Sequence, residues 1–261
     1  MKKSDLSKLL AVTWLICVCT LYTSLSHAGT LVDNFDGASI NKRLWEQWNT
    51  DQNQRCLQEN GVLKIQIGGA STGSIFGAGV YSNFQLKGDF EIVVDYSFIK
   101  WPDSNGVRTG IRYNGQPTAH GMIMRISPDK NATINPQGYY STNFIDGSYN
   151  NVSMSPTTAT SGRFKLTRVG SVMTGYYFQD NNWVYRGSYD YSVTDALPEW
   201  IGIDFSAWSH TVLQQPDGKY VYPFAGKDVE VTIDNLQITY DKIEYFSSPV
   251  PIPGILLLLL D

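Results

Sequence analysis

Cysteine and histidine, which build disulfides and most zinc sites, are scarce in this chain of 261 residues. It contains three of each, and two of the cysteines and one of the histidines lie in the first 28 residues. Beyond that segment Cys56 stands alone, so no internal disulfide can form and we expect a small buried apolar side chain there. His120 and His210 are too few for a histidine-rich zinc site. Packing must therefore hold the domain together.

Clusters of basic residues are lacking as well. The 20 lysines and arginines are spread among 24 aspartates and glutamates, and the formal net charge is −4. A nucleic-acid-binding protein needs clustered basic side chains to displace counterions, so we expect no nucleic-acid partner. The sequence also has no Gly-x-Ser-x-Gly motif, phosphate-binding loop or dinucleotide fingerprint. Serine-hydrolase and nucleotide chemistry are therefore not indicated.

Residues 1–28 have the three parts of a secretory signal peptide. Lys2 and Lys3 precede an apolar run over residues 9–25, and Ser26-His27-Ala28 is a small-x-small cleavage site before Gly29. Threonines interrupt the run and a processing site follows it, so we favour a cleaved leader, with a retained membrane anchor as the alternative. We therefore expect the protein to be secreted or associated with the cell surface or envelope.

Alternation of apolar and polar residues dominates residues 29–245, which we expect to form one domain. The clearest strand spans residues 88–98, and residues 162–188 read as three consecutive strands with turns at Gly170-Ser171 and at residues 180–182. No confident long helix appears. The pattern predicts an all-β, two-sheet antiparallel sandwich of jelly-roll type, with a closed barrel as the alternative.

Three segments carry more local expectations. Trp45 and Trp48 have the spacing of one helical turn or an irregular wrap, and residues 127–160 are rich enough in Asn, Ser and Gly to be mostly loop. In the last strand, residues 229–240, the apolar phase changes at Asp234-Asn235. One extra residue at that point, a β-bulge, would keep both halves facing the core and re-aim the Asp234 side chain.

The order of these pieces resembles the concanavalin A-like lectin and glucanase superfamily, in particular its secreted bacterial members. The resemblance rests on several short motifs that cover most of residues 31–240. These are Asn34-Phe35-Asp36-Gly37, Leu44-Trp45, Trp101-Pro102, Gly106-Val107-Arg108-Thr109-Gly110, Leu166-Thr167-Arg168, Gly175-Tyr176-Tyr177 and Ile233-Asp234-Asn235-Leu236. The motifs mark a fold more than an activity, because the superfamily includes both enzymes and non-enzymatic sugar binders.

The resemblance implies a test for catalysis, since glycosidases of this fold carry Glu-x-Asp-x-Glu on a strand of the concave sheet. The segment most similar to this motif, from Glu91 to Asp95, lies on an earlier strand than the catalytic one. Residues 121–125, which align best with the catalytic strand, contain no carboxylate. We therefore expect a non-catalytic, lectin-like module that binds a polysaccharide of the cell envelope or matrix. The alternatives are a glycoside hydrolase that uses Glu91 and Asp95 on a β-glucan-like polysaccharide, and a structural envelope protein without a sugar site.

Sugar binding needs flat aromatic faces for the apolar sides of pyranose rings and polar side chains for their hydroxyls. Aromatic and arginine residues on or beside the predicted strands meet this need. The candidate carbohydrate-binding residues are Trp101, Arg108, Arg112, Arg125, Tyr139, Tyr140 and Trp208.

The resemblance also implies a structural Ca²⁺ where the first and last strands meet, held by an aspartate of the closing strand and by backbone carbonyls. Asp234, with Asp33 or Asp36 nearby, fits this oxygen ligation. Residues 246–261 form a Pro-rich linker and an apolar end that resembles a truncated PEP-CTERM-like sorting signal of exported bacterial proteins. That resemblance implies a membrane sorting enzyme as a partner, although the short apolar run lacks the length of a spanning helix and a following basic cluster.

Overall fold

The computed structural model describes residues 29–69, 76–103, 106–115, 119–128, 137–145, 148–193, 198–209, 213–214, 220–221 and 228–246. The predicted leader and most of the predicted sorting segment lie outside these residues. Within them there are seventeen β-strands, one short 3-10 helix and no α-helix. Consequently, no helix in the described part of the chain has the length and apolar character needed to cross a membrane.

The strands are β1 (Gly29–Asp33), β2 (Trp45–Asn49), β3 (Gln54–Glu59), β4 (Val62–Ile67), β5 (Phe76–Ser82), β6 (Phe84–Lys100), β7 (Arg108–Gly115), β8 (Ala119–Ile126), β9 (Gly138–Ile145), β10 (Ser148–Pro156), β11 (Ser161–Val169), β12 (Val172–Gln179), β13 (Asn182–Asp190), β14 (Trp200–Ser209), β15 (Leu213–Gln214), β16 (Tyr220–Val221) and β17 (Val229–Tyr245). The 3-10 helix η1 spans Tyr191–Val193.

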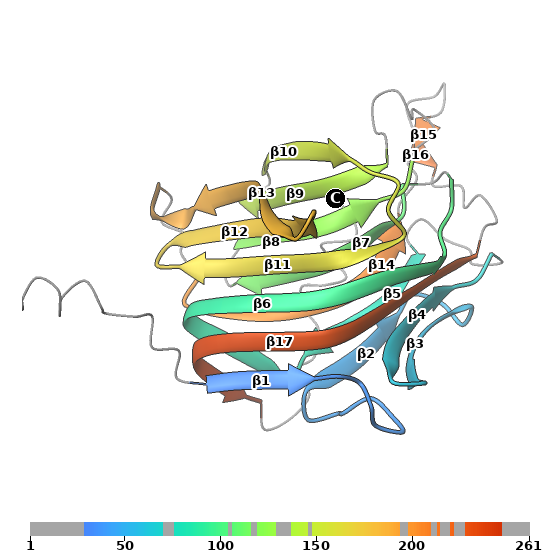
Figure 1. The fold of residues 1–261 in the computed structure, drawn as a ribbon, viewed down its shortest axis with the longest axis horizontal. Helices are drawn as coiled ribbons and strands as arrows, with labels where there is room; N and C mark the ends of the chain where they lie inside the picture. The colour runs from blue at the N-terminus through green and yellow to red at the C-terminus, as the bar shows by residue number, and fades with distance from the viewer. Residues whose placement is uncertain are drawn as a thin grey trace, which may run out of the picture.

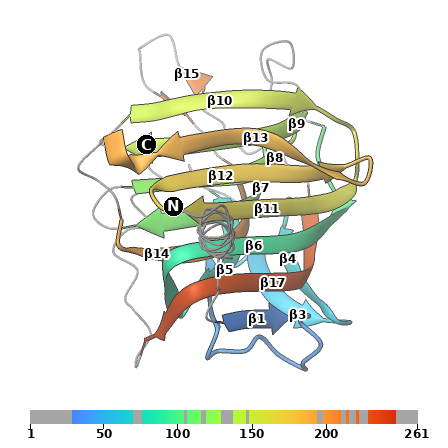
Figure 2. The same ribbon diagram turned by 60° about the vertical axis from the view of Figure 1, so that its left-hand side comes forward.

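Two layers of antiparallel strands form a sandwich (Figures 1 and 2). The front sheet, nearest the viewer in Figure 1, has the order β3-β4-β17-β6-β11-β12-β13, and β1 pairs with the C-terminal half of β17. The back sheet has the order β2-β5-β14-β7-β8-β9-β10. A short pairing between β14 and β6 joins the two sheets. The prediction of an all-β antiparallel jelly-roll sandwich is confirmed.

The core lies between the sheets, and alternation along each strand fills it. On β6 the residues Phe90, Ile92, Val94 and Tyr96 are buried, and the residues between them are partly exposed on the solvent side. Buried side chains of β11, β14 and β17 belong to the same hydrophobic cluster as these β6 residues. Cys56 is buried in this core as expected, and burial raises the pKa of its thiol, so it packs as an apolar group.

Turns and irregularities follow the sequence signals. Gly170, Asp180 and Asn181 have positive φ angles of 60°, 50° and 60°, which the β11–β12 and β12–β13 turns require. The register of β17 against β6 shifts between Asp234 and Gln237, which confirms the predicted bulge. Ile233 and Leu236 on either side of it are both fully buried. The bulge therefore keeps both halves of β17 facing the core.

Two local expectations were wrong. Leu44, Trp45 and Trp48 were expected in one helical turn or an irregular wrap, but the two tryptophans lie on β2, a strand that pairs with β5. A single turn forms only directly before this strand, where the amides of Leu44 and Trp45 both donate to the Asn41 carbonyl at 2.9 Å. Trp45 packs edge-on against the core rings of Phe84 and Phe205. Pairing with β5 therefore determines the backbone conformation of this segment, and the helix-like spacing of the two tryptophans does not. Residues 127–160, expected as mostly loop, contain β9 and β10, which extend the back sheet beyond β8.

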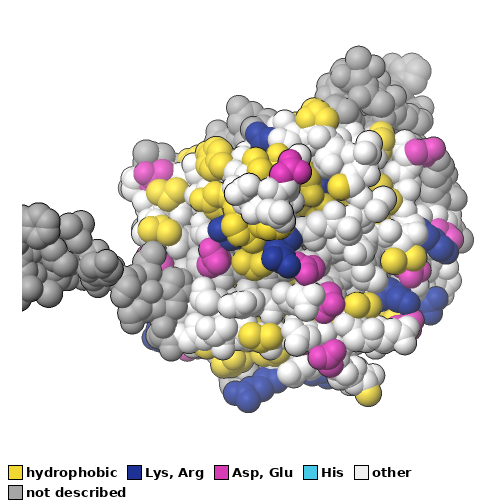
Figure 3. Space-filling model, viewed as in Figure 1, with side chains coloured by type: hydrophobic (Ala, Val, Ile, Leu, Met, Phe, Trp, Pro, Cys, Tyr) yellow, Lys and Arg dark blue, Asp and Glu magenta, His cyan; other side chains and the backbone are white. Residues whose placement is uncertain are grey.

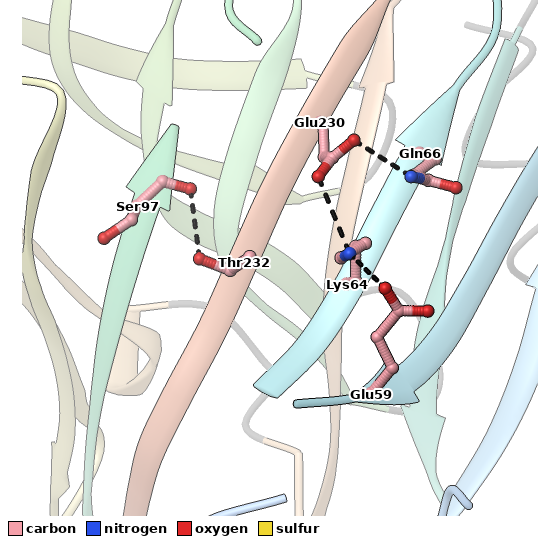
Figure 4. A network of polar contacts seen from close by, with 6 residues as sticks. All are labelled: Glu59, Lys64, Gln66, Ser97, Glu230 and Thr232. Carbon is pink, nitrogen blue, oxygen red and sulfur yellow. Dashed lines mark hydrogen bonds and ion pairs between the residues drawn. The ribbon is translucent and has the colours of Figure 1, made fainter. Parts of the chain in front are cut away.

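Polar side chains connect four strands on the solvent side of the front sheet (Figure 4). The Lys64 ammonium lies 2.5 Å from a Glu59 oxygen and 3.8 Å from a Glu230 oxygen, so it bridges β3 and β17. Its hydrogen bond to Glu59 raises the pKa of Lys64. Thr232 donates to the carbonyl of Ser97 at 3.4 Å and connects β17 with β6. Such surface ion pairs stabilise weakly, so their main effect is on strand register.

Candidate functional site

The face of the back sheet that points away from the main core carries a group of aromatic and arginine residues. Directly opposed residues of antiparallel strands point to the same side, so the strand register defines rows across the sheet. The first row is Glu46, Tyr81, Asp204, Arg112, Met122 and Thr142; the second is Trp48, Gly79, Ser206, Gly110, Met124, Tyr140 and Met154; the third is Gly77, Trp208, Arg108, Ile126 and Gly138. These rows are called the back-sheet face below.

The centre of the back-sheet face is a second apolar cluster, separate from the main core. Its buried members are Trp48, Met122, Met124, Ile126, Tyr140 and Trp208, and Tyr81 and Met154 pack against it. Gly77 allows the two tryptophans to converge, because a Cβ there would lie 2.7 Å from Trp208 Cβ and 3.1 Å from Trp48 Cη2. Burial raises the pKa of Tyr81 and of Tyr140, so both phenols remain neutral hydrogen-bonding groups.

A fully buried carboxylate organises the polar part of this face. Asp204 Oδ2 accepts hydrogen bonds from Arg112 Nη2 at 2.9 Å and from Trp48 Nε1 at 3.0 Å. Asp204 Oδ1 accepts a hydrogen bond from Ser206 Oγ at 2.5 Å. A buried charge is tolerated only when it is paired and hydrogen-bonded, and here every bond also fixes a neighbour. The network therefore holds the Trp48 indole and the Arg112 guanidinium in place.

Four of the predicted carbohydrate-binding residues lie together on this face. Arg108 and Arg112 are on β7, Trp208 is on β14 and Tyr140 is on β9. The Arg108 guanidinium lies 4.7 Å from the centre of the Trp208 ring and donates to the carbonyl of Gly106. The cation stacks on the aromatic face, so the partly exposed Arg108 covers one side of the buried Trp208 ring, which is 7% exposed.

The other three lie elsewhere. Arg125 on β8 and Tyr139 on β9 point to the opposite, core side of the back sheet, since they alternate with Met124 and Tyr140. Arg125 is 0% exposed and donates to Tyr96 Oη at 3.0 Å and to the Ala159 carbonyl at 2.7 Å. Tyr139 stacks on the core residue Tyr177, with the ring centres 4.1 Å apart. These two side chains are therefore part of the interior.

Trp101 follows β6 and stacks flat on Phe98, with ring centres 3.9 Å apart and an interplanar angle of 3°. It packs against the main core and takes no part in the back-sheet face. Sequence reasoning missed Trp48, Asp204, Met122 and Met124. The signal that could have found the two methionines was alternation on the strand of residues 119–126, whereas Trp48 and Asp204 could be recognised only once β2, β5 and β14 were known to be neighbours.

The acid pair considered for hydrolysis lies on the other sheet. Glu91 and Asp95 are on the solvent side of β6, four residues apart, which along a strand is about 13 Å. Asp95 pairs with Arg163 at 2.5 Å and Glu91 with Lys165 at 3.4 Å. A retaining glycosidase needs its two carboxyl groups about 5 to 5.5 Å apart. In the described part of the back-sheet face, the carboxylates are Glu46 and Asp204.

The three aspartates predicted to hold Ca²⁺ lie where β1 and β17 meet. Asp33 uses both oxygens within the fold: one accepts from the Phe35 amide at 2.9 Å, the other from Trp45 Nε1 at 2.8 Å. Asp234 has a raised pKa, first because of burial and then because of the charges of Asp95 and Asp36. Among the described residues, no three acidic, histidine or cysteine side chains form a metal-binding group. A cation here would therefore depend on Asp234, Asp36 and backbone carbonyls.

Backbone strain marks the same place. Phe35 and Asn235, which directly precede Asp36 and follow Asp234, have φ angles of 53° and 50°. Non-glycine residues adopt positive φ at an energetic cost, and such residues concentrate at functional sites. Asp234 Oδ1 accepts a hydrogen bond from the Asn235 amide at 2.6 Å. The strained backbone and the negative charges of Asp234, Asp95 and Asp36 near one another are the features of this region that fit an oxygen-ligated cation.

Comparison with solved structures places the fold among concanavalin A-like β-glucanases. The structure of a β-glucanase of Bacillus licheniformis matches with 11% sequence identity and a TM-score of 0.54, and the match covers 81% of this chain and 98% of the glucanase. A glycoside hydrolase family 16 endo-glucanase from Bacteroides ovatus is 13% identical with a TM-score of 0.56, and covers 82% and 99%. A structure from work on endo-acting O-glycanases of the human gut microbiota is 12% identical with a TM-score of 0.60, and covers 81% and 99%.

At these identities the likeness concerns the fold alone. No curated protein matches the chain in sequence. A family model does match, over residues 24–214, and these residues include the back-sheet face from β2 to β14. The chain therefore belongs to the family described as "Protein of unknown function (DUF1583) C domain".

Proposed function

We propose that this domain is an exported, non-catalytic, lectin-like module that binds a polysaccharide of the cell envelope or extracellular matrix on its back-sheet face. The fold is one on which the structural neighbours act on glycans, such as the β-glucanase and the endo-glucanase named above. The back-sheet face of this chain carries aromatic and arginine side chains. Arg108, Arg112, Tyr140 and Trp208 are the predicted residues that this proposal retains.

The observation that carries the proposal is the Trp48–Asp204–Arg112 network beside Trp208. Sugar recognition combines ring stacking with fixed polar groups, and a preorganised site loses less entropy when it binds. Arg112 Nε is buried and has no hydrogen-bond partner among the described residues. The partly exposed Glu46, Tyr81 and Arg108 supply a polar rim around the apolar centre.

The chemistry of the face argues against hydrolysis. On β8, the strand that aligns best with the catalytic one, the outward positions are His120, Met122, Met124 and Ile126, and none of them supplies the carboxylate that a retaining mechanism needs. Both Asp204 oxygens are already engaged, and Glu46 is two strands away, a backbone separation of about 10 Å. That arrangement does not provide the close pair of a retaining enzyme.

Affinity electrophoresis through gels that contain envelope or matrix polysaccharides tests the proposal. We expect retardation of the parent protein and a weaker effect for Trp208→Ala and for the milder Arg108→Gln, each confirmed as folded by circular dichroism. Tyr245→Ala is the matched control. This exposed tyrosine on β17 also has an arginine, Arg43, stacked over its ring, but it lies on the other sheet. Unretarded parent protein on every polysaccharide would contradict the proposal and favour a structural protein without a sugar site.

Hydrolysis remains the second candidate because the fold is shared with endo-glucanases and the back-sheet face retains Glu46 and Asp204. The assay measures reducing ends released from a β-glucan panel by the parent, Glu46→Gln and Glu91→Gln. Our proposal expects no release from any of the three proteins. Release that Glu46→Gln or Glu91→Gln abolishes would replace it with an enzymatic function.

We further propose a structural Ca²⁺ held by Asp36, Asp234 and backbone carbonyls beside them, which would neutralise the clustered negative charge. Calcium should raise the melting temperature of the parent, and Asp234→Asn should remove this rise. Asp33→Asn is the control: it should lower the melting temperature equally with calcium or EDTA, because Asp33 holds Trp45.

The pKa of Asp234 gives that test an internal check. Its pKa is higher in the folded state than the usual value, so the folded protein binds the proton more tightly than the unfolded chain. In EDTA, the contribution of Asp234 to stability should therefore fall as the pH rises through this raised pKa. Asp234→Asn should flatten this part of the pH profile. A profile that the substitution leaves unchanged would refute the assignment.

Export and anchoring complete the proposal. Residues 1–28 act as the cleaved leader, and residues 246–261 act as a signal for a membrane sorting enzyme. Mass spectrometry of the protein recovered from culture medium and from envelope fractions should give Gly29 as the first residue. A chain that retains residues 1–28 in the membrane fraction would support the anchor alternative instead.

A further inference from the structure

A second group of aromatic side chains lies on the solvent side of the front sheet, over β11, β12 and β13. Strand register places Lys165 opposite Tyr176, Tyr176 opposite Tyr185, and Phe178 opposite Trp183. Together with Arg163 on β11, these six residues are called the front-sheet patch. Figure 3 views this sheet and shows hydrophobic side chains gathered over these strands, with basic and acidic side chains beside them.

The rings of the patch are held in fixed orientations. Phe178 and Trp183 meet edge to face with centres 5.1 Å apart, and Tyr176 and Tyr185 do so at 6.2 Å. The Lys165 ammonium lies 4.8 Å from the Tyr176 ring centre and 4.6 Å from that of Trp183. Cation–π contacts and cross-strand pairs therefore preorganise the surface before any ligand arrives.

Carboxylates of the neighbouring strand β6 balance the positive charges of the patch. Arg163 pairs with Asp95 through hydrogen bonds from its Nε and Nη2 atoms, and Lys165 pairs with Glu91 at 3.4 Å. Two cations thus face two carboxylates, and their formal charges sum to zero. An anionic polymer or a membrane surface would have to compete with these carboxylates for the two cations. The patch is therefore complementary to an uncharged ligand.

The folded core does not account for the aromatic residues of the patch. The opposite side of β12 already supplies Met173 and Tyr177 to the core, and Tyr185 remains 57% exposed. Protein interfaces are depleted of charged residues at their centres, whereas two ion pairs border the middle of this patch. Flat rings beside charged hydrogen-bonding groups suit a polyhydroxylated ligand, whose ring faces are apolar and whose edges are polar.

We propose that the front-sheet patch is a second glycan-binding site, specific for an uncharged polysaccharide. Trp183 and Tyr185 stack on pyranose faces, while Arg163, Lys165, Asp95 and Glu91 bond hydroxyl groups. The site lies on the opposite sheet from the back-sheet face, so it does not depend on the function proposed for that face. A domain with both sites can hold two polysaccharide segments at once.

Affinity electrophoresis with three polymers tests this site: hydroxyethyl cellulose and laminarin, which are neutral, and carboxymethyl cellulose, which is acidic. We expect the neutral polymers to retard the parent protein more strongly than the acidic one, and equal or stronger retardation by the acidic polymer would contradict the specificity for an uncharged ligand. Combining Trp183→Ala with Tyr185→Ala should weaken apparent affinity about threefold to tenfold, because aromatic stacking contributes on the order of one power of ten in binding. Tyr185→Phe keeps the ring and should retain binding.

Tyr245→Ala again serves as the matched control, since it removes an exposed tyrosine of the front sheet outside the patch. Parent protein that no neutral polymer retards, or equal retardation of the parent and the Trp183/Tyr185 double variant, overturns the second site. Loss in the double variant with no loss in Trp208→Ala sustains this site and contradicts the back-sheet proposal. If only Trp208→Ala loses retardation, the back-sheet proposal is sustained and the second site is contradicted.

Discussion

At the scale of single residues, Asp204 is the side chain on which the back-sheet face depends most. It is fully buried and accepts hydrogen bonds from Arg112, Trp48 and Ser206. Asp204→Asn keeps the shape but leaves the Arg112 cation buried without its counter-charge, so we expect a loss of about 3 to 5 kcal/mol in the free energy of unfolding. Urea titration followed by fluorescence measures it.

A double variant separates charge from shape in that experiment. Arg112→Met combined with Asp204→Asn removes both charges, so it should recover part of the stability lost by Asp204→Asn alone. A single variant that loses less than about 1 kcal/mol would show that the buried pair does not organise this face.

Arg125 offers the opposite test, since the sequence predicts a ligand contact and the structure places it in the interior. Its guanidinium binds Tyr96 Oη and the carbonyls of Thr157 and Ala159. Arg125→Met leaves these acceptors without a donor, so we expect about 2 to 3 kcal/mol of destabilisation and no change in glycan affinity of the folded variant. Urea titration and affinity electrophoresis measure the two effects. Unchanged stability with weakened binding would restore Arg125 to the binding site.

At the scale of elements, the turn at Gly170 isolates a pure backbone effect. Its φ is +60° and a Cβ there would meet nothing within 4 Å, so no steric contact complicates a substitution. We expect Gly170→Ala to cost about 1 to 2 kcal/mol, because an L-residue is strained in the left-handed region. Gly170→Asn should cost less, since asparagine tolerates that region. Thermal unfolding checks the order of the three proteins, and equal costs for both variants would argue against a backbone origin.

Local patterns predict the elements well where one face of a strand is buried and a turn residue bounds it. Residues 88–98 and the meander of residues 162–188 are of this kind, and so is the bulge at Asp234. The strands β9 and β10 were not predictable in this way. β10 is rich in Asn and Ser and has weak strand propensity, whereas β9 contains strand-favouring Tyr, Thr, Phe and Ile without a regular alternation of apolar and polar residues. Pairing of β9 with β8 and of β10 with β9 therefore decides their conformation.

The candidate site was harder to predict than the elements for a related reason. Period-2 alternation gives the two faces of each strand, but it does not give the order of the strands in a sheet. Trp48, Asp204 and Arg112 come from β2, β14 and β7, and only the sheet order brings them together. Alternation alone places Arg125 on the opposite side of β8 from Met122, Met124 and Ile126, and it would assign this apolar row, not Arg125, to the core. The packing of the two sheets decides that Arg125 faces the interior.

At the scale of the whole molecule, two sheets with separate solvent sides give two separate surfaces for a ligand. A short oligosaccharide can occupy one surface at a time, whereas a long polymer or a polymer network can engage both. The second contact then forms at the high effective concentration set by the first. We therefore expect apparent affinity for a long neutral polymer to exceed that for its short oligosaccharides by more than either site alone explains.

Calorimetry with short oligosaccharides and electrophoresis with the parent polymer measure the two affinities. Trp208→Ala and the Trp183/Tyr185 double variant should each remove the polymer's advantage, because a single remaining site cannot benefit from a second contact. Each variant should still bind a short oligosaccharide at its intact site, which distinguishes lost avidity from lost folding. If either variant keeps the full polymer advantage, then one surface alone holds the polysaccharide and the other is only a solvent-facing side of the sandwich.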